Sequence, residues 1–71
     1  MKEKIGETAG IIWKILKSKG EVNISQLPKI LKEKSEIVYQ ALGWLAREDK
    51  INYSTKNRRN YVSLAESEKG K

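Results

Sequence analysis

The chain has 71 residues, with 15 lysines and arginines against nine aspartates and glutamates, and its formal net charge is +6. It contains neither cysteine nor histidine, which excludes disulfides and thiolate metal sites. A chain this short can bury only one small core, so we expect a single domain stabilised by a few kcal/mol. The positive charge favours a polyanionic partner such as nucleic acid, with solubility alone as the alternative reading.

The first half of the chain begins with a pattern typical of an amphipathic helix. Between Lys4 and Lys19, apolar residues recur at helical spacing, and Gly20 is well suited to end the helix. The residues of this apolar stripe are Ile5, Ala9, Ile12 and Leu16, flanked by Trp13 and Ile15. The segment from Glu21 to Ile24 then favours a short β-strand.

Two further helices are predicted, joined by a very tight turn. Ser25 is the expected N-cap of the second helix, which carries Pro28 in its first turn and ends near Lys34. Ser35 is the expected cap of the third helix, from Glu36 to Glu48. The apolar side chains that we expect these two helices to bury are Leu27, Ile30, Leu31, Val38, Ala41, Leu42 and Leu45.

Beyond Asp49 the hydrophobic period changes to two, which predicts a β-hairpin. With a four-residue loop from Lys56 to Arg59, the register pairs Thr55 with Asn60, Tyr53 with Val62 and Ile51 with Leu64. The pairing puts four apolar side chains on one face and leaves Tyr61 pointing outward. Residues 66–71 offer no apolar side chain to bury, so we expect a disordered tail after a domain spanning residues 1–65.

The order helix, short strand, helix, tight turn, helix and hairpin resembles an α+β winged helix-turn-helix domain. More narrowly, IGETAGIIWKIL and ALGWLAREDKI resemble a family of small, largely uncharacterised prokaryotic winged-helix proteins, in which an AGxxW stretch opens the chain and a GWLxRE stretch ends the third helix. The resemblance implies a DNA-binding-like module and a capacity for self-association. It carries no ligand or catalytic residue to transfer.

In such a fold the third helix can lie in the major groove of DNA while the hairpin tip follows the backbone. The third helix presents Glu36, Tyr39, Gln40, Gly43 and Arg47 opposite its buried stripe. Gln40 can contact adenine, and Arg47 can reach guanine or phosphate. At the hairpin tip, Lys56, Arg58 and Arg59 can neutralise roughly three phosphates. The candidate DNA-binding residues are Lys34, Tyr39, Gln40, Arg47, Lys56, Arg58, Arg59 and Tyr61. The alternative is that the helix face is only solvated and the charged tip only keeps the hairpin edges unpaired.

Three glycines lie inside predicted helices, where each costs about 1 kcal/mol relative to alanine. Gly6 and Gly10 are one turn apart and leave a bare patch that allows another helix to approach closely. Gly43 lies beside Trp44, which we expect to pack in the core between the third and first helices. The patch then receives either the two tryptophans or the equivalent helix of a second chain. The residues of this interface or close-packing site are Gly6, Gly10, Trp13, Gly43 and Trp44.

Enzymatic activity is not expected, because the chain has no histidine, no phosphate-binding glycine pattern and no acidic cluster with metal-ligand spacing. No cofactor, metal or small-molecule substrate is predicted. No apolar run approaches the roughly twenty residues of a membrane span, so we expect a soluble cytoplasmic protein without a membrane partner. Two hypotheses remain. The first is a DNA-binding transcriptional regulator that acts on double-stranded DNA. The second is a protein-interaction or homodimerisation module.

Overall fold

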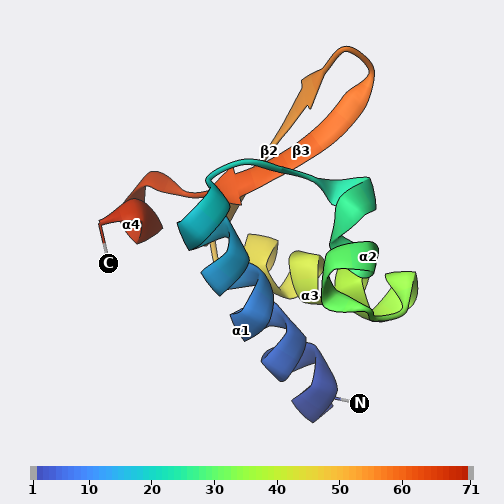
Figure 1. The fold of residues 1–71 in the computed structure, drawn as a ribbon. Helices are drawn as coiled ribbons and strands as arrows, with labels where there is room; N and C mark the ends of the chain where they lie inside the picture. Colours follow the sequence, from blue (N-terminus) through green and yellow to red (C-terminus); the bar gives the residue numbers. More distant parts are fainter. Residues whose placement is uncertain (1, 71) are drawn as a thin grey trace.

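The computed structural model describes residues 2–70, which form helices packed against a three-stranded antiparallel sheet. In chain order the elements are α1 (Lys2–Lys19), β1 (Val22–Asn23), the 3-10 turn η1 (Ile24–Gln26), α2 (Leu27–Leu31), α3 (Ser35–Arg47), β2 (Ile51–Lys56), β3 (Arg59–Leu64) and α4 (Glu66–Lys69). Figure 1 shows the β2–β3 hairpin extending away from the helices as a wing. The predicted winged helix-turn-helix architecture is confirmed.

Helix α1 supplies one wall of the core. Its stripe of Ala9, Ile12 and Leu16 is buried, as the spacing predicts. The helix ends at Gly20, whose backbone N–H donates to the carbonyl of Leu16 at 2.8 Å and whose φ is 84°. A side chain is strained in this left-handed conformation, so glycine is the residue that lets the chain turn here towards the sheet. Among residues 2–70, no helix has both the length and the apolar character to cross a membrane.

The start of the helix-turn-helix differs from the prediction. Asn23, rather than Ser25, is the capping residue: its side-chain oxygen accepts from the backbone N–H of Ser25 at 3.0 Å and from the Ser25 hydroxyl at 2.8 Å. An asparagine can reach an amide two residues on, so a 3-10 turn begins before the α-helix. Helix α2 ends at Leu31, not near Lys34, because Lys32 takes a left-handed conformation with φ 54°.

Helix α3 also begins without the predicted cap. Ser35 is its first helical residue, and Lys34 precedes it in an extended conformation without a side-chain capping bond. The predicted buried stripe of Val38, Ala41, Leu42 and Leu45 is confirmed. In α2 the expectation holds only in part, since Leu27 is fully buried while the Ile30 side chain is 42% exposed. The buried core consists of Ala9, Ile12, Leu16, Val22, Leu27, Val38, Ala41, Leu42, Leu45, Ile51, Val62 and Leu64.

The wing has the predicted register but a shorter loop. Ile51 pairs with Leu64, Tyr53 with Val62 and Thr55 with Asn60, and the ladder continues to a pair between Lys56 and Arg59. Only Asn57 and Arg58 form the loop, and their φ values of 51° and 65° are those of a type I′ turn. The tight turn keeps the arginines at the very end of the ribbon.

Strand β1 completes the sheet on the other side of β3, with Val22 opposite Val62 and Asn23 opposite Tyr61. The central strand β3 is therefore hydrogen-bonded along both edges and contacts α1. Strand β2 lies at the edge of the sheet, and its Tyr53 is 52% exposed instead of sharing the buried face. The apolar face of the wing thus narrows to Ile51, Val62 and Leu64.

The composition of residues 66–71 predicts disorder, whereas Glu66–Lys69 form the short helix α4. The Trp13 indole N–H donates to a carboxylate oxygen of Glu68 at 3.0 Å, and the Lys17 ammonium donates to the carbonyl of Lys69 at 2.7 Å. Glu68 is only 6% exposed. Polar contacts to α1, rather than apolar burial, therefore hold this segment. Position 71 lies outside the described residues.

Candidate nucleic-acid interface

A surface hollow lies between the start of the helix-turn-helix and the wing. One wall is the segment Asn23 to Gln26, another is Tyr39 of α3, and the third is Arg58, Arg59 and Asn60 of the wing. The tip arginines therefore lie on the same side of the molecule as the outward face of α3. This is the arrangement that contact between the wing, α3 and a DNA duplex requires.

The lining of the hollow is chemically suited to phosphate oxygens. Arg58 and Arg59 supply guanidinium donors, which pair with phosphate in a bidentate fashion. Ser25, Gln26 and Asn60 add a hydroxyl and two amides on facing walls. Charged donors and neutral donors thus converge on one concave surface.

The predicted residues of α3 divide by their position along the helix. Tyr39 lines the hollow and is 51% exposed, whereas Gln40, the next residue, is exposed but does not line the hollow. Lys34 is exposed just before the first turn of α3. Arg47 is exposed at the other end, about 12 Å further along the axis than Tyr39, and lies beside Trp44 and Glu48. The structure therefore brings Tyr39 of α3 towards the wing tip and leaves Arg47 apart.

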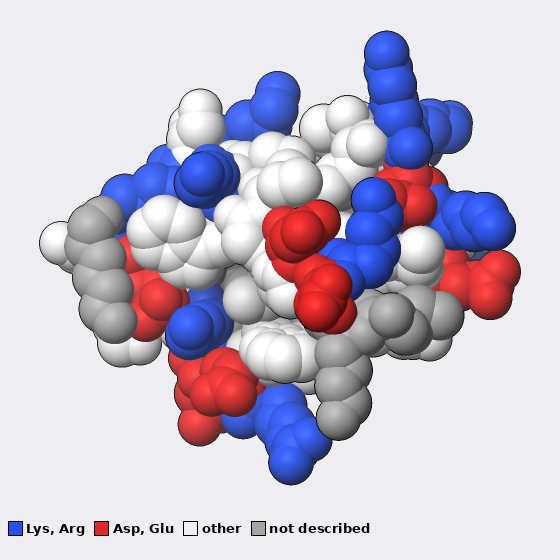
Figure 2. All heavy atoms as spheres, turned by 90° about the horizontal axis from the view of Figure 1, so that it is seen from below, with Lys and Arg blue, Asp and Glu red and all other residues white. Residues whose placement is uncertain are grey.

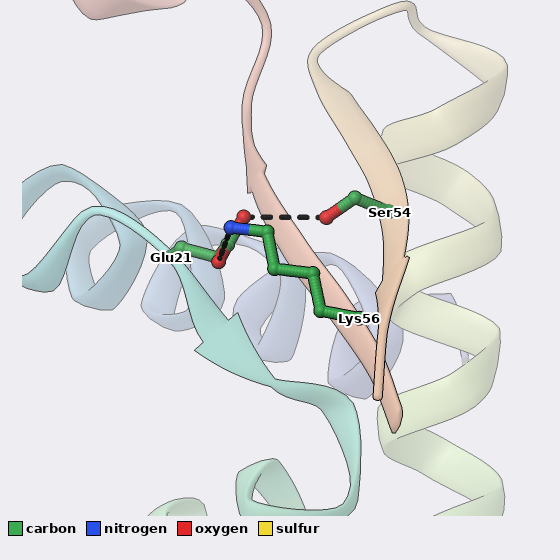
Figure 3. A network of polar contacts seen from close by, with 3 residues as sticks. All are labelled: Glu21, Ser54 and Lys56. Atoms are coloured by element: carbon green, nitrogen blue, oxygen red, sulfur yellow. Dashed lines mark hydrogen bonds and ion pairs between the residues drawn. The ribbon is translucent and has the colours of Figure 1, made fainter. Parts of the chain in front are cut away.

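Lys56 is predicted to act with the tip arginines, but the structure engages it elsewhere. Its ammonium lies 2.8 Å from a carboxylate oxygen of Glu21 (Figure 3). The same ammonium lies 5.9 Å from the centre of the Tyr61 ring. The hydrogen bond from Lys56 lowers the pKa of the Glu21 carboxyl, and the same bond raises the pKa of Lys56. Neither Lys56 nor Tyr61 lines the hollow.

The polar side chains of Ser25, Gln26 and Asn60 in the hollow were not predicted from the sequence as binding residues. The sequence predicted Ser25 only as a helix cap and Asn60 only as the strand partner of Thr55. In the structure, the Thr55 hydroxyl donates to the Asn60 side chain at 3.1 Å. The run NISQ before an apolar helix is the signal that could have identified Ser25 and Gln26, because it places several polar groups at the entry of the helix-turn-helix.

A second groove lies on the other side of α3. It is lined by Gly6, Ala9, Gly10, Trp13, Lys14, Trp44, Leu45, Lys50 and Glu68. Four of the five predicted interface residues meet here, while Gly43 lies outside the groove. Trp13 is partly buried against the core, as expected.

The prediction that Trp44 packs in the core is wrong, because its side chain is 44% exposed. Leu45, the next residue, takes the buried position, and a residue one place along a helix is turned by about 100° away from it. The glycine patch is also not closely packed within the chain. A Cβ placed at Gly6 or Gly10 would meet no atom of the described residues within 4 Å.

The lining of the hollow differs in charge from the face seen from below the helices. Seen from below the helices, acidic and basic side chains are interspersed, and acidic side chains lie near the centre of the view (Figure 2). That face therefore offers no continuous basic strip to a phosphate backbone. The hollow beside the wing, by contrast, contains two arginines and no acidic residue in its lining.

Comparison with known proteins agrees with this architecture. The chain is 57% identical over 51 residues to the uncharacterised protein MJ1608 of Methanocaldococcus jannaschii, an alignment that covers 68% of this chain and 71% of that protein. The structure superposes on a ZitR mutant of Lactococcus lactis in apo form with a TM-score of 0.84 and 22% identity, covering 96% of this chain and 53% of that one. The chain thus spans about half the length of ZitR.

A further likeness is to HlyU of Vibrio vulnificus, described as a transcriptional regulator, with a TM-score of 0.78, 23% identity, and coverage of 90% of this chain and 67% of that one. At these identities the structural likenesses establish the fold alone. The family described as winged helix-turn-helix domain (DUF2582) matches residues 1–64. The chain belongs to this winged helix-turn-helix family.

Proposed function

We propose that the protein is a DNA-binding regulator of transcription without catalytic activity, acting in the cytoplasm on double-stranded DNA. The winged helix-turn-helix fold, shared with a described transcriptional regulator, supports the class. The observation that carries the proposal is the hollow in which Arg58 and Arg59 of the wing face the same space as Tyr39 of α3.

Each part of the hollow has a role in this proposal. Arg58 and Arg59 bind phosphates from the wing, and Ser25 with Gln26 contacts the backbone at the entry of the helix-turn-helix. Tyr39 and Gln40, on the exposed face of α3, meet the base edges in the major groove. Phosphate contacts supply affinity and orientation, whereas the contacts of α3 supply sequence preference.

The test is the salt dependence of duplex binding by wild type and by a variant carrying Arg58→Ala and Arg59→Ala. Losing two phosphate contacts should reduce the slope of log K against log salt by about 1.8. A matched control, Lys14→Ala with Lys50→Ala, removes the same charge from the opposite groove. The control should keep nearly the wild-type slope. Equal losses in the two variants would show that only net charge matters, and would contradict the proposed interface.

A second candidate function, self-association, is favoured by the open glycines. Gly6 and Gly10 together cost roughly 2 kcal/mol in a soluble helix, and no described side chain lies within 4 Å of a Cβ added at either position. The same groove presents Trp44, a large exposed side chain. One face that carries both a cavity and a protrusion can pair with its own copy across a two-fold axis. We propose a second copy of this chain as the occupant.

Sedimentation of Gly10→Leu tests this second candidate. A leucine there should fill the groove and convert a dimer into a folded monomer. Gly43→Leu is the matched control, because Gly43 is also a helical glycine with open space around it but lies outside the groove. If wild type sediments as a monomer, or if the two variants behave alike, the groove is not a dimer interface.

A further inference from the structure

A carboxylate beside β1 contacts the outer strand of the wing. One oxygen of Glu21 lies 2.8 Å from the Lys56 ammonium, and the other accepts from the Ser54 hydroxyl at 3.2 Å. Glu21 directly precedes β1, while Lys56 and Ser54 belong to β2. Because β3 lies between these two strands, the contact spans the width of the sheet, as Figure 3 shows.

This contact changes which cations the wing presents. Lys56 is the direct strand partner of Arg59, so the two side chains leave the ribbon on the same face. Arg59 lines the hollow, but Lys56 does not, and its ammonium instead lies against Glu21. The carboxylate offers the lysine what a phosphate offers, namely anionic oxygens at hydrogen-bond distance.

Among the described ion pairs, this is the one at the wing. The pair between Lys4 and Glu33 joins α1 to the turn after α2, and the pair between Lys69 and Glu66 lies within α4. The Lys56 side chain is 60% exposed, so its ammonium could reach a phosphate if the carboxylate of Glu21 were removed. The directions of the pKa shifts of Glu21 and Lys56 agree with a formed pair.

We propose that Glu21 acts as an internal substitute for a phosphate, withholding Lys56 from DNA so that the wing binds through Arg58 and Arg59 alone. This inference rests on the proposed function and concerns the regulation of its affinity. A smaller number of phosphate contacts weakens sequence-independent binding and makes it less sensitive to salt. The contacts of α3 to bases then supply a larger share of the binding free energy, so the protein discriminates better between DNA sequences.

The first arm of the test uses the free protein. In wild type, the NMR titration of the Lys56 ammonium should give a pKa above its ordinary value, and Glu21→Gln should return it towards that value. Ser54→Ala is the control, because it removes the other hydrogen bond of Glu21 and keeps the ion pair. No difference between wild type and Glu21→Gln would overturn the inference.

The second arm measures random-duplex binding across a range of salt concentrations. Glu21→Gln should bind more tightly and steepen the salt slope by about 0.9, the value for one added phosphate contact. Lys56→Ala should keep the wild-type slope, and the double variant should return to it. A slope unchanged by Glu21→Gln, or a slope reduced by Lys56→Ala as much as by Arg58→Ala, would overturn the inference alone. If wild type binds no duplex, the proposed function fails and this inference fails with it.

Discussion

The short helix α2 depends on a single buried side chain, and replacing that side chain should show how much stability it supplies. Leu27 is fully buried, whereas Ile30, three residues later in the same helix, is 42% exposed. Leu27→Ala removes atoms from the core and leaves a cavity. A domain this small has few neighbouring apolar side chains that could move to fill that cavity. Losses of 2–5 kcal/mol are typical of such sites, and we take about 3 kcal/mol as the expected value.

The size of the expected thermal shift follows from the chain length. Unfolding entropies of about 2.1 cal/mol/K per residue give roughly 150 cal/mol/K for 71 residues, so each kcal/mol lowers the midpoint by about 7 °C. A loss of about 3 kcal/mol therefore lowers Tm by about 20 °C. This is a large part of the stability that so small a domain can have.

The matched control is Ile30→Ala, which deletes a side chain of similar size from the exposed side of α2. It should cost less than about 1 kcal/mol, because much of the side chain already contacts water and alanine is the better helix former. Urea denaturation followed by circular dichroism gives both free energies. Equal losses for the two variants, or a loss below about 1 kcal/mol for Leu27→Ala, would refute the packing described for α2.

Three further predictions concern single contacts. Gly20→Ala places a side chain at φ 84° and should destabilise the fold by about 1 kcal/mol in urea denaturation; an unchanged midpoint would contradict the strained turn. Glu68→Gln should alter the fluorescence of Trp13, whose indole N–H donates to that carboxylate, while identical spectra would count against the α4 contact. The lowered pKa of Glu21 means that its ion pair with Lys56 stabilises the wing above pH 4.5 and is lost as the pH falls through the folded value. A carboxyl NMR titration that placed the Glu21 midpoint at or above 4.5 would refute this pair.

Local patterns sufficed for most of the fold. The alternation from Ile51 to Leu64 determines the strand register, since a slip by one residue would expose every buried side chain of the wing. The loop length was not predictable in the same way. Asn57 and Arg58 form a tight type I′ turn, although such turns usually contain a glycine at one of the two positions. Because this glycine is absent, the sequence predicted a longer loop.

Contacts between distant residues account for the other differences. Helix α4 depends on Trp13 and Glu68, which are 55 positions apart, so the composition of the tail alone predicts disorder. Glu21 and Lys56 are 35 positions apart, and neither residue carries a local sign that they pair across the sheet. Trp44 lies at the border of the buried apolar stripe of α3, where a residue and its next neighbour along the helix can differ between burial in the core and exposure to solvent. The hydrophobic pattern is too coarse to resolve that difference.

In the proposed complex, the wing arginines and the first half of α3 contact one duplex together. Backbone amide NMR of the labelled protein, titrated with a short random duplex at low salt, tests this most directly. We predict that the shifted resonances gather around Ser25, Tyr39 and Arg58, with Gly10 and Trp44 unaffected by DNA at concentrations that keep the oligomeric state constant. Shifts centred on Gly10 and Trp44, or no shifts at any site, would show that DNA does not bind at the hollow beside the wing.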